Sequence, residues 1–201
     1  MKMKTATLIG TFDPLHGGHI GQALRVHHLV PLQKLYICVD KNPAHKPHAS
    51  SWQHRLAMAE LTLAAFDLPF DYEVIAVEDS SARELPATVN CKITGIDSLV
   101  ENLQDPARWS YAQQWPMVVL SIPGIAASTL TTALDQLPPE IRQTIVYQYA
   151  DESAVPMMNY DFTKNEFVSE VIHATMVRTK GNTAHIPPSV QEYIQTHKLY
   201  A

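Results

Sequence analysis

Short apolar runs alternate with longer amphipathic segments along most of this chain of 201 residues. The run Thr5–Ile9 is typical of a buried strand, and Gly10 ends it. From Gly18 onward, apolar residues recur at spacings of three and four, which is the pattern of one helix face. Similar patterns predict further strands and helices: strands at 34–39, 70–77, 89–96, 116–122 and 144–149, and helices at 52–66, 97–103 and 188–197.

Strands that alternate with helices in this way indicate βαβ units and a mostly parallel sheet. We therefore expect an α/β protein with a Rossmann-like, doubly wound sheet of five to six strands and helices on both faces. No internal repeat or low-complexity linker divides the sequence, so we expect one domain over residues 1–201. A helical segment from about 175 to 201 is expected to pack on it. Residues 150–164 carry the weakest pattern and predict a loop.

Composition narrows the possible partners. The net charge is −5 and no basic stripe is present, so we expect no nucleic-acid partner. No apolar run is long enough to cross a bilayer and the first residues lack a secretory signal, so we expect a soluble cytoplasmic protein without a membrane partner. Cys38 and Cys91 lie in apolar strand patterns, which favours buried thiols over a disulfide.

The turn after the first strand carries the strongest chemical signal. The stretch Gly10–His19 reads GTFDPLHGGH, with two histidines three residues apart at a helix start. Such positions lie on the same helix face, so both imidazoles can reach one anion. We expect free backbone N–H groups, the helix dipole and a close approach over the glycines to make this turn a phosphate site. The alternative is an ordinary capped helix whose histidines lie at the surface or in the core.

Two further segments follow predicted strands and carry polar groups. Residues 42–55 hold His45, Lys46 and Arg55, and such a cationic loop suits a substrate with phosphate or carboxylate groups, although composition alone equally fits a solvated loop. Asp97 follows Gly95 at the end of the fourth predicted strand, where a carboxylate can accept hydrogen bonds from a ribose diol. Gly-x-Asp is also an ordinary helix N-cap, so that alternative stays open.

These motifs together resemble a known family. GTFDPLHGGH resembles the (T/H)xGH signature of the nucleotidylyltransferase superfamily, and its GxFDPxHxGH form is most similar to the bacterial nicotinate-mononucleotide adenylyltransferases. The resemblance covers essentially the whole chain. It includes a P-x-H-K segment at 43–46, the G-x-D at 95–97 and an ending similar to the family's terminal L-V-P-x-x-V-x-x-Y-I-x-x-x-x-L-Y, which is a packing element.

Residues 172–178, IHATMVR, resemble the family's I-S-S-T-x-I-R motif, whose helix start and arginine can hold a triphosphate. Thr175 and Arg178 match this motif, whereas His173 and Ala174 replace two serines. Ile122 also departs from the family, because many members carry an arginine before the Pro-Gly pair.

The resemblance implies an enzyme that transfers AMP from ATP to a phosphorylated acceptor and releases pyrophosphate in NAD biosynthesis. The acceptor that the resemblance implies is nicotinate mononucleotide. Mg²⁺ is expected to bridge the ATP phosphates and to be coordinated largely by water, with no metal site built from protein residues. Other partners are small nucleotides and, as an open option, a second copy of the chain. The implied roles are catalytic for His16, His19, Lys46 and Arg178, nucleotide-binding for Gly10, Thr11, Phe12, Gly18, His19, Gly95, Asp97, Thr175 and Arg178, and acceptor-binding for Thr11, His45, Lys46, Arg55 and Trp109.

Some alternatives remain open at this stage. The acceptor can instead be nicotinamide mononucleotide or phosphopantetheine, although threonine in place of His16 would have favoured phosphopantetheine. The altered residues His173 and Ala174 also leave room for a nucleotide-binding regulator without turnover. Trp109 competes with Trp115 for stacking on the acceptor base, and packing in the core is the alternative for both.

Overall fold

The central sheet confirms the predicted fold class. The computed structural model describes residues 4–43, 46–78, 85–122, 124–150, 159–168 and 174–200. Six strands form one sheet in the order β3-β2-β1-β4-β5-β6, and all neighbouring pairs are parallel. The strands are β1 (Thr5–Gly10), β2 (Lys34–Asp40), β3 (Asp71–Val77), β4 (Cys91–Gly95), β5 (Met117–Leu120) and β6 (Tyr147–Ala150).

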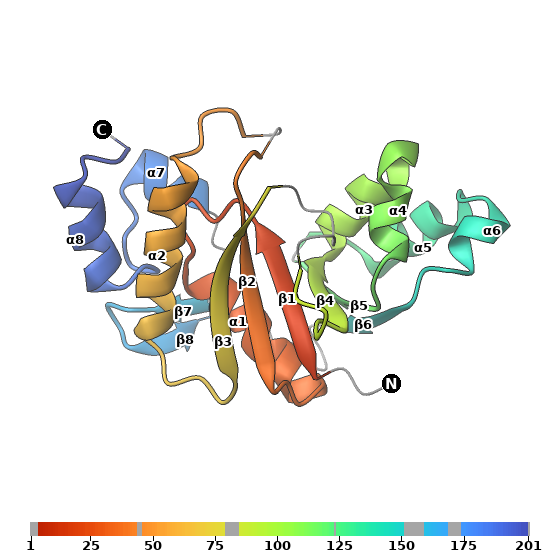
Figure 1. Ribbon diagram of the computed structural model, residues 1–201, viewed down its shortest axis with the longest axis horizontal. Coiled ribbons are helices and arrows are strands. Elements are labelled where there is room, and N and C mark those ends of the chain that lie inside the picture. The colour runs from red at the N-terminus through yellow and green to blue at the C-terminus, as the bar shows by residue number, and fades with distance from the viewer. Residues whose placement is uncertain are drawn as a thin grey trace.

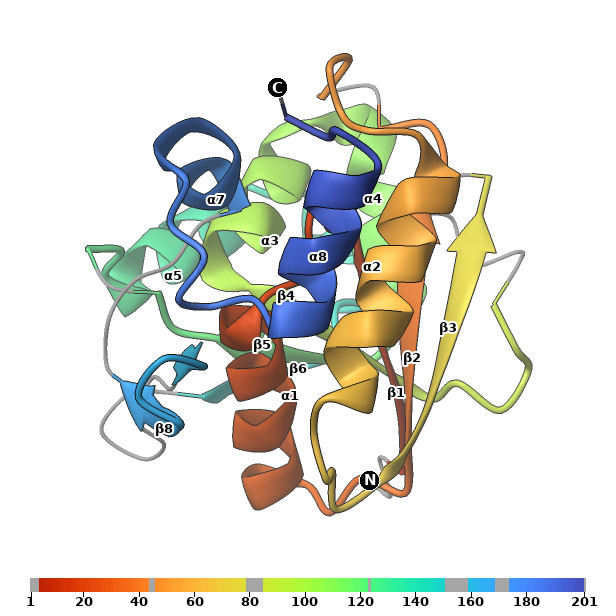
Figure 2. The same ribbon diagram turned by 90° about the vertical axis from the view of Figure 1, so that its left-hand side faces the viewer.

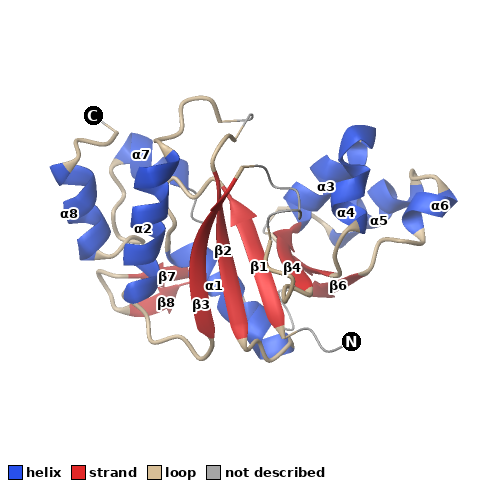
Figure 3. Cartoon of the chain, viewed as in Figure 1, coloured by secondary structure: helices blue, strands red, loops and turns tan. Residues whose placement is uncertain are grey.

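Helices cover both faces of this sheet, as the doubly wound pattern predicts (Figure 1, Figure 3). On one face, α1 (Gly17–Leu29) and α2 (Trp52–Ala64) pack against apolar side chains of β1, β2, β4 and β5. On the other face, α3 (Ile96–Gln104), α4 (Trp109–Gln113) and α5 (Ala127–Asp135) pack against β5. Each face therefore buries its own apolar cluster, and the sheet lies between the two clusters.

The register of the sheet decides which strand residues meet. Leu8 of β1 lies beside Ile37 and Ile93, and parallel neighbours in register point to the same face. All three are buried under α1 and α2. The preceding residue, Thr7, lies beside Lys92 on the opposite face, where Lys92 is 3% exposed.

Several short elements have no counterpart among the predictions. They are η2 (Pro106–Arg108), α6 (Pro139–Arg142), α5, α4 and the hairpin of β7 (Asn159–Asp161) and β8 (Glu166–Val168). Most of these elements span only one or two helical turns, or three strand residues. Such segments are too short to show a recognisable spacing of apolar residues in the sequence. The hairpin lies partly in residues 150–164, the segment with the weakest pattern.

The C-terminal segment returns across the molecule to α2. It consists of α7 (Ala174–Lys180) and α8 (Pro188–Thr196), and Figure 2 shows α8 lying beside α2. Met58 of α2 is buried with Val190 and Ile186 in one apolar cluster. The hydroxyl of Tyr193 lies 3.0 Å from Nδ1 of His54, which ties the same two helices at their surface. This packing brings the last residues of the chain back towards the β1 turn.

Two expectations from composition can be compared with the structure. Cys38 and Cys91 are both buried and free, as predicted. Within the described ranges, none of the helices combines the length and the apolar character that crossing a membrane requires.

The buried Lys92 predicts a pH-dependent stability. Burial lowers the pKa of Lys92 to about 7, against 10.5 for an ordinary lysine. Between these two values the unfolded chain binds a proton that the folded chain does not, so the free energy of unfolding rises with pH, by up to about 1.4 kcal/mol per unit. Below about pH 7 both states are protonated and this contribution is constant.

We expect Lys92→Met to remove this slope between pH 7 and 9.5, as measured by urea unfolding. The matched control is Lys34→Met, because Lys34 lies at the surface in an ion pair with Glu73 and its pKa is raised by that hydrogen bond. Its replacement should leave the slope in place. Equal slopes for wild type and Lys92→Met would contradict the assignment.

Candidate active site

The strand order places two of the predicted motifs side by side. The direction of strand addition reverses between β1 and β4, and ligands of such sheets bind outside the carboxyl ends of the strands at this switch point. The Gly10–His19 turn leaves the carboxyl end of β1, and Gly95 ends the neighbouring β4. The sheet therefore brings both segments to the position where a nucleotide is expected.

The two histidines of the turn form a capping box at the start of α1. Nδ1 of His16 accepts a hydrogen bond from the amide of Gly18 at 3.2 Å, and Nδ1 of His19 accepts one from the amide of His16 at 3.2 Å. Their ring centroids lie 3.9 Å apart. Because a backbone N–H can only donate, both Nδ1 atoms are unprotonated, and the proton of each neutral ring sits on Nε2. The turn thus holds two N–H donors next to each other.

The backbone amides of the helix start are not available as predicted. The amide of Gly17 donates to the carbonyl of His185 at 2.8 Å, and the amide of His19 donates to the carbonyl of His16 at 2.9 Å. The amide of Gly18 is used by His16, as described above. The expectation of free N–H groups at the first turn of α1 was therefore wrong. An anion at this turn would meet the imidazole N–H groups and the helix dipole instead.

The paired glycines also have a different reason from the predicted one. A Cβ on Gly17 would lie 2.3 Å from the carbonyl oxygen of Tyr160, and a Cβ on Gly18 would lie 2.5 Å from Oδ1 of Asn159. Gly17 is thus required because the backbone of β7 packs directly on the start of α1, whereas a Cβ on Gly18 would displace the side chain of Asn159. The amide of Gly18 caps the helix, and its contact with the nucleotide stays a prediction.

Phe12 and Gly10 shape the turn between the strand and the helix. Phe12 has a φ of 47°, in the left-handed region that side chains rarely adopt, and such residues cluster at functional sites. Its ring is buried and lies edge-on to the ring of His19, with centroids 5.1 Å apart. A Cβ on Gly10 would lie 3.0 Å from the Phe12 ring, which explains the glycine. Gly10 therefore leaves space for the Phe12 ring, and that ring packs against His19.

Thr11 holds a buried polar group that the protein does not satisfy. Its side chain is 4% exposed, and Oγ1 has no hydrogen-bond partner in the described part of the chain. A buried hydroxyl without a partner is costly, because it has lost water and gained nothing in return. Thr11 lies in the histidine turn, and we expect an anion bound there to reach this hydroxyl.

The predicted C-terminal motif meets the same turn. Arg178 of α7 donates to the backbone carbonyl of Asp13 at 2.5 Å and to Oγ1 of Thr175 at 3.2 Å. Partial desolvation and the nearby charge of Arg178 lower the pKa of Lys46, whereas the carboxylate of Asp13 opposes this shift. The structure therefore gathers Lys46, Arg178 and Thr175 around Asp13, although the sequence separates them widely. Two cations at the histidine turn suit a polyphosphate.

Arg55 has a structural role within the protein. The residue is 1% exposed, and its guanidinium donates to the carbonyls of Thr11, Asp40, Lys41 and Ser50. These bonds occupy four of its five N–H donors. Arg55 therefore fixes the β1 turn to the loop before α2, and its direct contact with substrate stays a prediction.

Gly95 and Asp97 lie at the carboxyl end of β4. Gly95 is the N-cap of α3 and Asp97 is in its first turn, without a side-chain capping bond. The alternative that Asp97 serves as a helix cap is thus not what the structure shows. A Cβ on Gly95 would lie 2.5 Å from Oδ1 of Asp97, so the glycine makes room for this exposed carboxylate.

The remaining predicted residues divide into two groups. Trp109 packs against the apolar cluster of α3 and α5, and its indole N–H donates to the carbonyl of Leu103 at 2.9 Å, which gives it a packing role. Trp115 packs against a separate apolar cluster that contains Tyr36 of β2. His45 and His173 lie outside the described residues.

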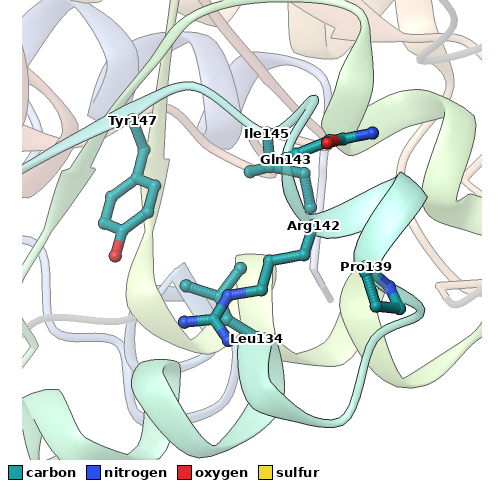
Figure 4. Close-up of a pocket in the computed structure, with 6 residues that line it drawn as sticks. All are labelled: Leu134, Pro139, Arg142, Gln143, Ile145 and Tyr147. Carbon is teal, nitrogen blue, oxygen red and sulfur yellow. The ribbon is translucent and has the colours of Figure 1, made fainter.

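A separate hollow lies away from these groups. It measures about 520 Å³ and lies between α5, α6 and the start of β6 (Figure 4). Arg142 in this hollow already pairs with Asp135 at 2.7 Å. Its lining residues are Leu134, Pro139, Arg142, Gln143, Ile145 and Tyr147.

Fold and site together define an α/β protein in which paired imidazoles and cationic side chains meet at the switch point of a parallel sheet. This is the arrangement that the nucleotidylyltransferase signature predicts. The chain belongs to the cytidylyltransferase-like family, whose model matches residues 7–180.

The chain is similar to curated relatives and to solved structures over nearly its full length. The chain is 27% identical over 215 residues to a probable nicotinate-nucleotide adenylyltransferase of Shewanella pealeana, covering 98% of this chain and 96% of the relative. It is also 27% identical over 216 residues to the Chlorobaculum tepidum protein of the same name, covering 99% and 100%. The fold is similar to that of Plasmodium falciparum nicotinic acid mononucleotide adenylyltransferase complexed with NaAD, with a TM-score of 0.63, 12% identity and coverage of 98% and 97%.

The unsatisfied hydroxyl of Thr11 can be tested by removing it. We expect Thr11→Val to weaken binding of inorganic tripolyphosphate about 5- to 10-fold by calorimetry, because one hydrogen bond to the anion is lost. The free energy of unfolding should stay the same or rise by up to about 1 kcal/mol, since no bond within the protein is broken.

The matched control is Thr7→Val in β1, the strand that leads into this turn, where the hydroxyl of Thr7 lies 3.1 Å from Sγ of Cys38. That variant should lose stability and bind tripolyphosphate normally. Unchanged affinity in Thr11→Val would show that Oγ1 of Thr11 faces no anion.

Proposed function

We propose that this protein transfers AMP from ATP to nicotinate mononucleotide and releases pyrophosphate, as a cytoplasmic enzyme of NAD biosynthesis with a single domain. The observation that carries this proposal is the His16–His19 pair at the switch point, with Arg178 reaching the same turn. Family membership and the names of the full-length relatives support the reaction class and the acceptor.

The reaction requires little covalent chemistry from the protein. A phosphate oxygen of the acceptor attacks the α-phosphorus of ATP, a new P–O bond forms, and the bond to the β-phosphate oxygen breaks in line. The electron pair of that bond leaves with pyrophosphate. Because a phosphate group is already ionised near neutral pH, no general base is needed, and catalysis consists of positioning and charge stabilisation.

The site groups suit this division of work. The Nε2–H groups of His16 and His19 would donate to oxygens of the α-phosphate, where charge accumulates during transfer. Lys46 and Arg178 would offset the charge of the leaving pyrophosphate. The hydroxyl of Thr11 would bind a phosphate oxygen.

Asp97 would accept hydrogen bonds from a ribose diol. Mg²⁺ would enter bound to the ATP phosphates and to water, since the described residues include no group of three or more His, Cys, Asp or Glu side chains that could hold a metal ion.

His19→Asn tests the role of the imidazole directly. The asparagine oxygen can still accept the amide of His16, but the variant lacks the Nε2–H donor. We expect kcat to fall about 100- to 1,000-fold, as for removal of one preorganised donor. The free energy of unfolding should change little.

His28→Asn is the matched control, because His28 is exposed at the far end of the same helix. Pyrophosphate release measures both variants. A His19→Asn variant with the wild-type rate would exclude His19 from the chemistry.

The acceptor is tested by pyrophosphate release from ATP with three acceptors in parallel. Nicotinate mononucleotide should give the highest kcat/KM, above nicotinamide mononucleotide and phosphopantetheine. A higher value with either competitor would change the acceptor and leave the reaction class in place. ATP binding without release from any acceptor would favour a regulator and overturn the proposed activity.

A further inference from the structure

The last residues of the chain reach the floor of the candidate active site. The hydroxyl of Tyr200 donates to Oδ1 of Asp13 at 2.7 Å, across 187 positions of sequence. The second carboxylate oxygen, Oδ2, accepts the backbone amide of Ser50 at 3.1 Å. Asp13 is 3% exposed. One buried carboxylate thus joins the β1 turn, the loop before α2 and the C-terminus.

The fold holds Tyr200 firmly in this position. α8 packs on α2, and Tyr200 packs against the same cluster as Met58 and Val190. Tyr200 has a φ of 64°, in the left-handed region. Burial and the carboxylate of Asp13 both raise the pKa of Tyr200, so its hydroxyl stays protonated and remains a donor.

Asp13 connects the groups that we assign to phosphate binding. Its backbone carbonyl accepts Arg178 at 2.5 Å. Its side chain accepts a hydrogen bond from the amide of Ser50, which lies in the same loop as Lys46. Its charge also acts on Lys46, where it opposes the lowering of the pKa by Arg178. The position of Asp13 therefore sets the relative positions of the two cations.

A buried carboxylate among cations can also compete with the substrate. If Oδ1 of Asp13 lost its donor, it would be a buried acceptor without a partner. Such a group is costly, and a direct ion pair with a nearby cation would lower its free energy. Lys46, Arg178 and Arg55 are the cations that act on this region, and Arg55 already donates to four backbone carbonyls, which leaves Lys46 and Arg178 as the partners for Asp13. A direct pair with either would neutralise the charge that a phosphate needs.

We propose that Tyr200 is a positioning residue of the active site. Its hydroxyl keeps the carboxylate of Asp13 hydrogen-bonded, so that Lys46 and Arg178 stay available to phosphate. The assignment of those two cations rests on the proposed function. The tyrosine acts through Asp13 and does not itself touch the substrate.

Tyr200→Phe tests the proposal, because it removes one hydroxyl and keeps the ring. The matched control is Tyr193→Phe in the same C-terminal segment, which removes a hydroxyl that lies 3.0 Å from His54, away from Asp13. Unfolding in urea, calorimetric binding of tripolyphosphate, and kcat and KM for ATP are measured for both. The folded fraction from the unfolding curves normalises the other values.

We expect both variants to lose similar stability. Only Tyr200→Phe should bind tripolyphosphate about 10-fold more weakly, raise KM for ATP and lower kcat about 10-fold or more, as misplaced groups do. Equal anion binding and equal kinetics in the two variants would overturn the proposal. If wild type transfers AMP to no acceptor, the proposed function fails, and the tripolyphosphate comparison still decides the role of Tyr200.

Discussion

The structure depends on two hydrogen bonds from backbone amides to imidazole nitrogens. Nδ1 of His16 and Nδ1 of His19 cap the first turn of α1, and this fixes the proton of each neutral ring on Nε2. The same bonds hold the rings against each other and against the edge of Phe12. A helix cap, which normally serves stability, here also determines which atoms of the site can donate to an anion.

The sheet and the C-terminal segment place the other groups around this pair. The strand order brings the end of β4 beside the end of β1, and α7 carries Arg178 to the carbonyl of Asp13. Arg55 uses its donors on four carbonyls and so joins the turn to the loop that carries Lys46. The site is therefore rigid mainly through bonds to backbone atoms, which explains how a short turn can hold a strained residue such as Phe12.

The sequence predicted those features that local patterns encode. Alternating apolar runs predicted the parallel sheet, and the short spacing in GTFDPLHGGH predicted that His16 and His19 share a face. It did not predict the reason for Gly17, because that reason is the backbone of β7 about 140 residues later. Asp13 and Tyr200 were missed for the same cause: the only signals were an Asp-Pro inside a known turn and a terminal Leu-Tyr assigned to packing. Contacts between residues so far apart in the chain produce no local pattern that a single sequence could reveal.

Nitrogen NMR of the histidine side chains with and without inorganic tripolyphosphate tests the role of the two imidazoles most directly. We expect His16 and His19 both to carry their proton on Nε2 and both Nε2–H signals to shift when the anion binds. A proton on Nδ1 of either ring, or signals that do not move at saturating tripolyphosphate, would contradict that role.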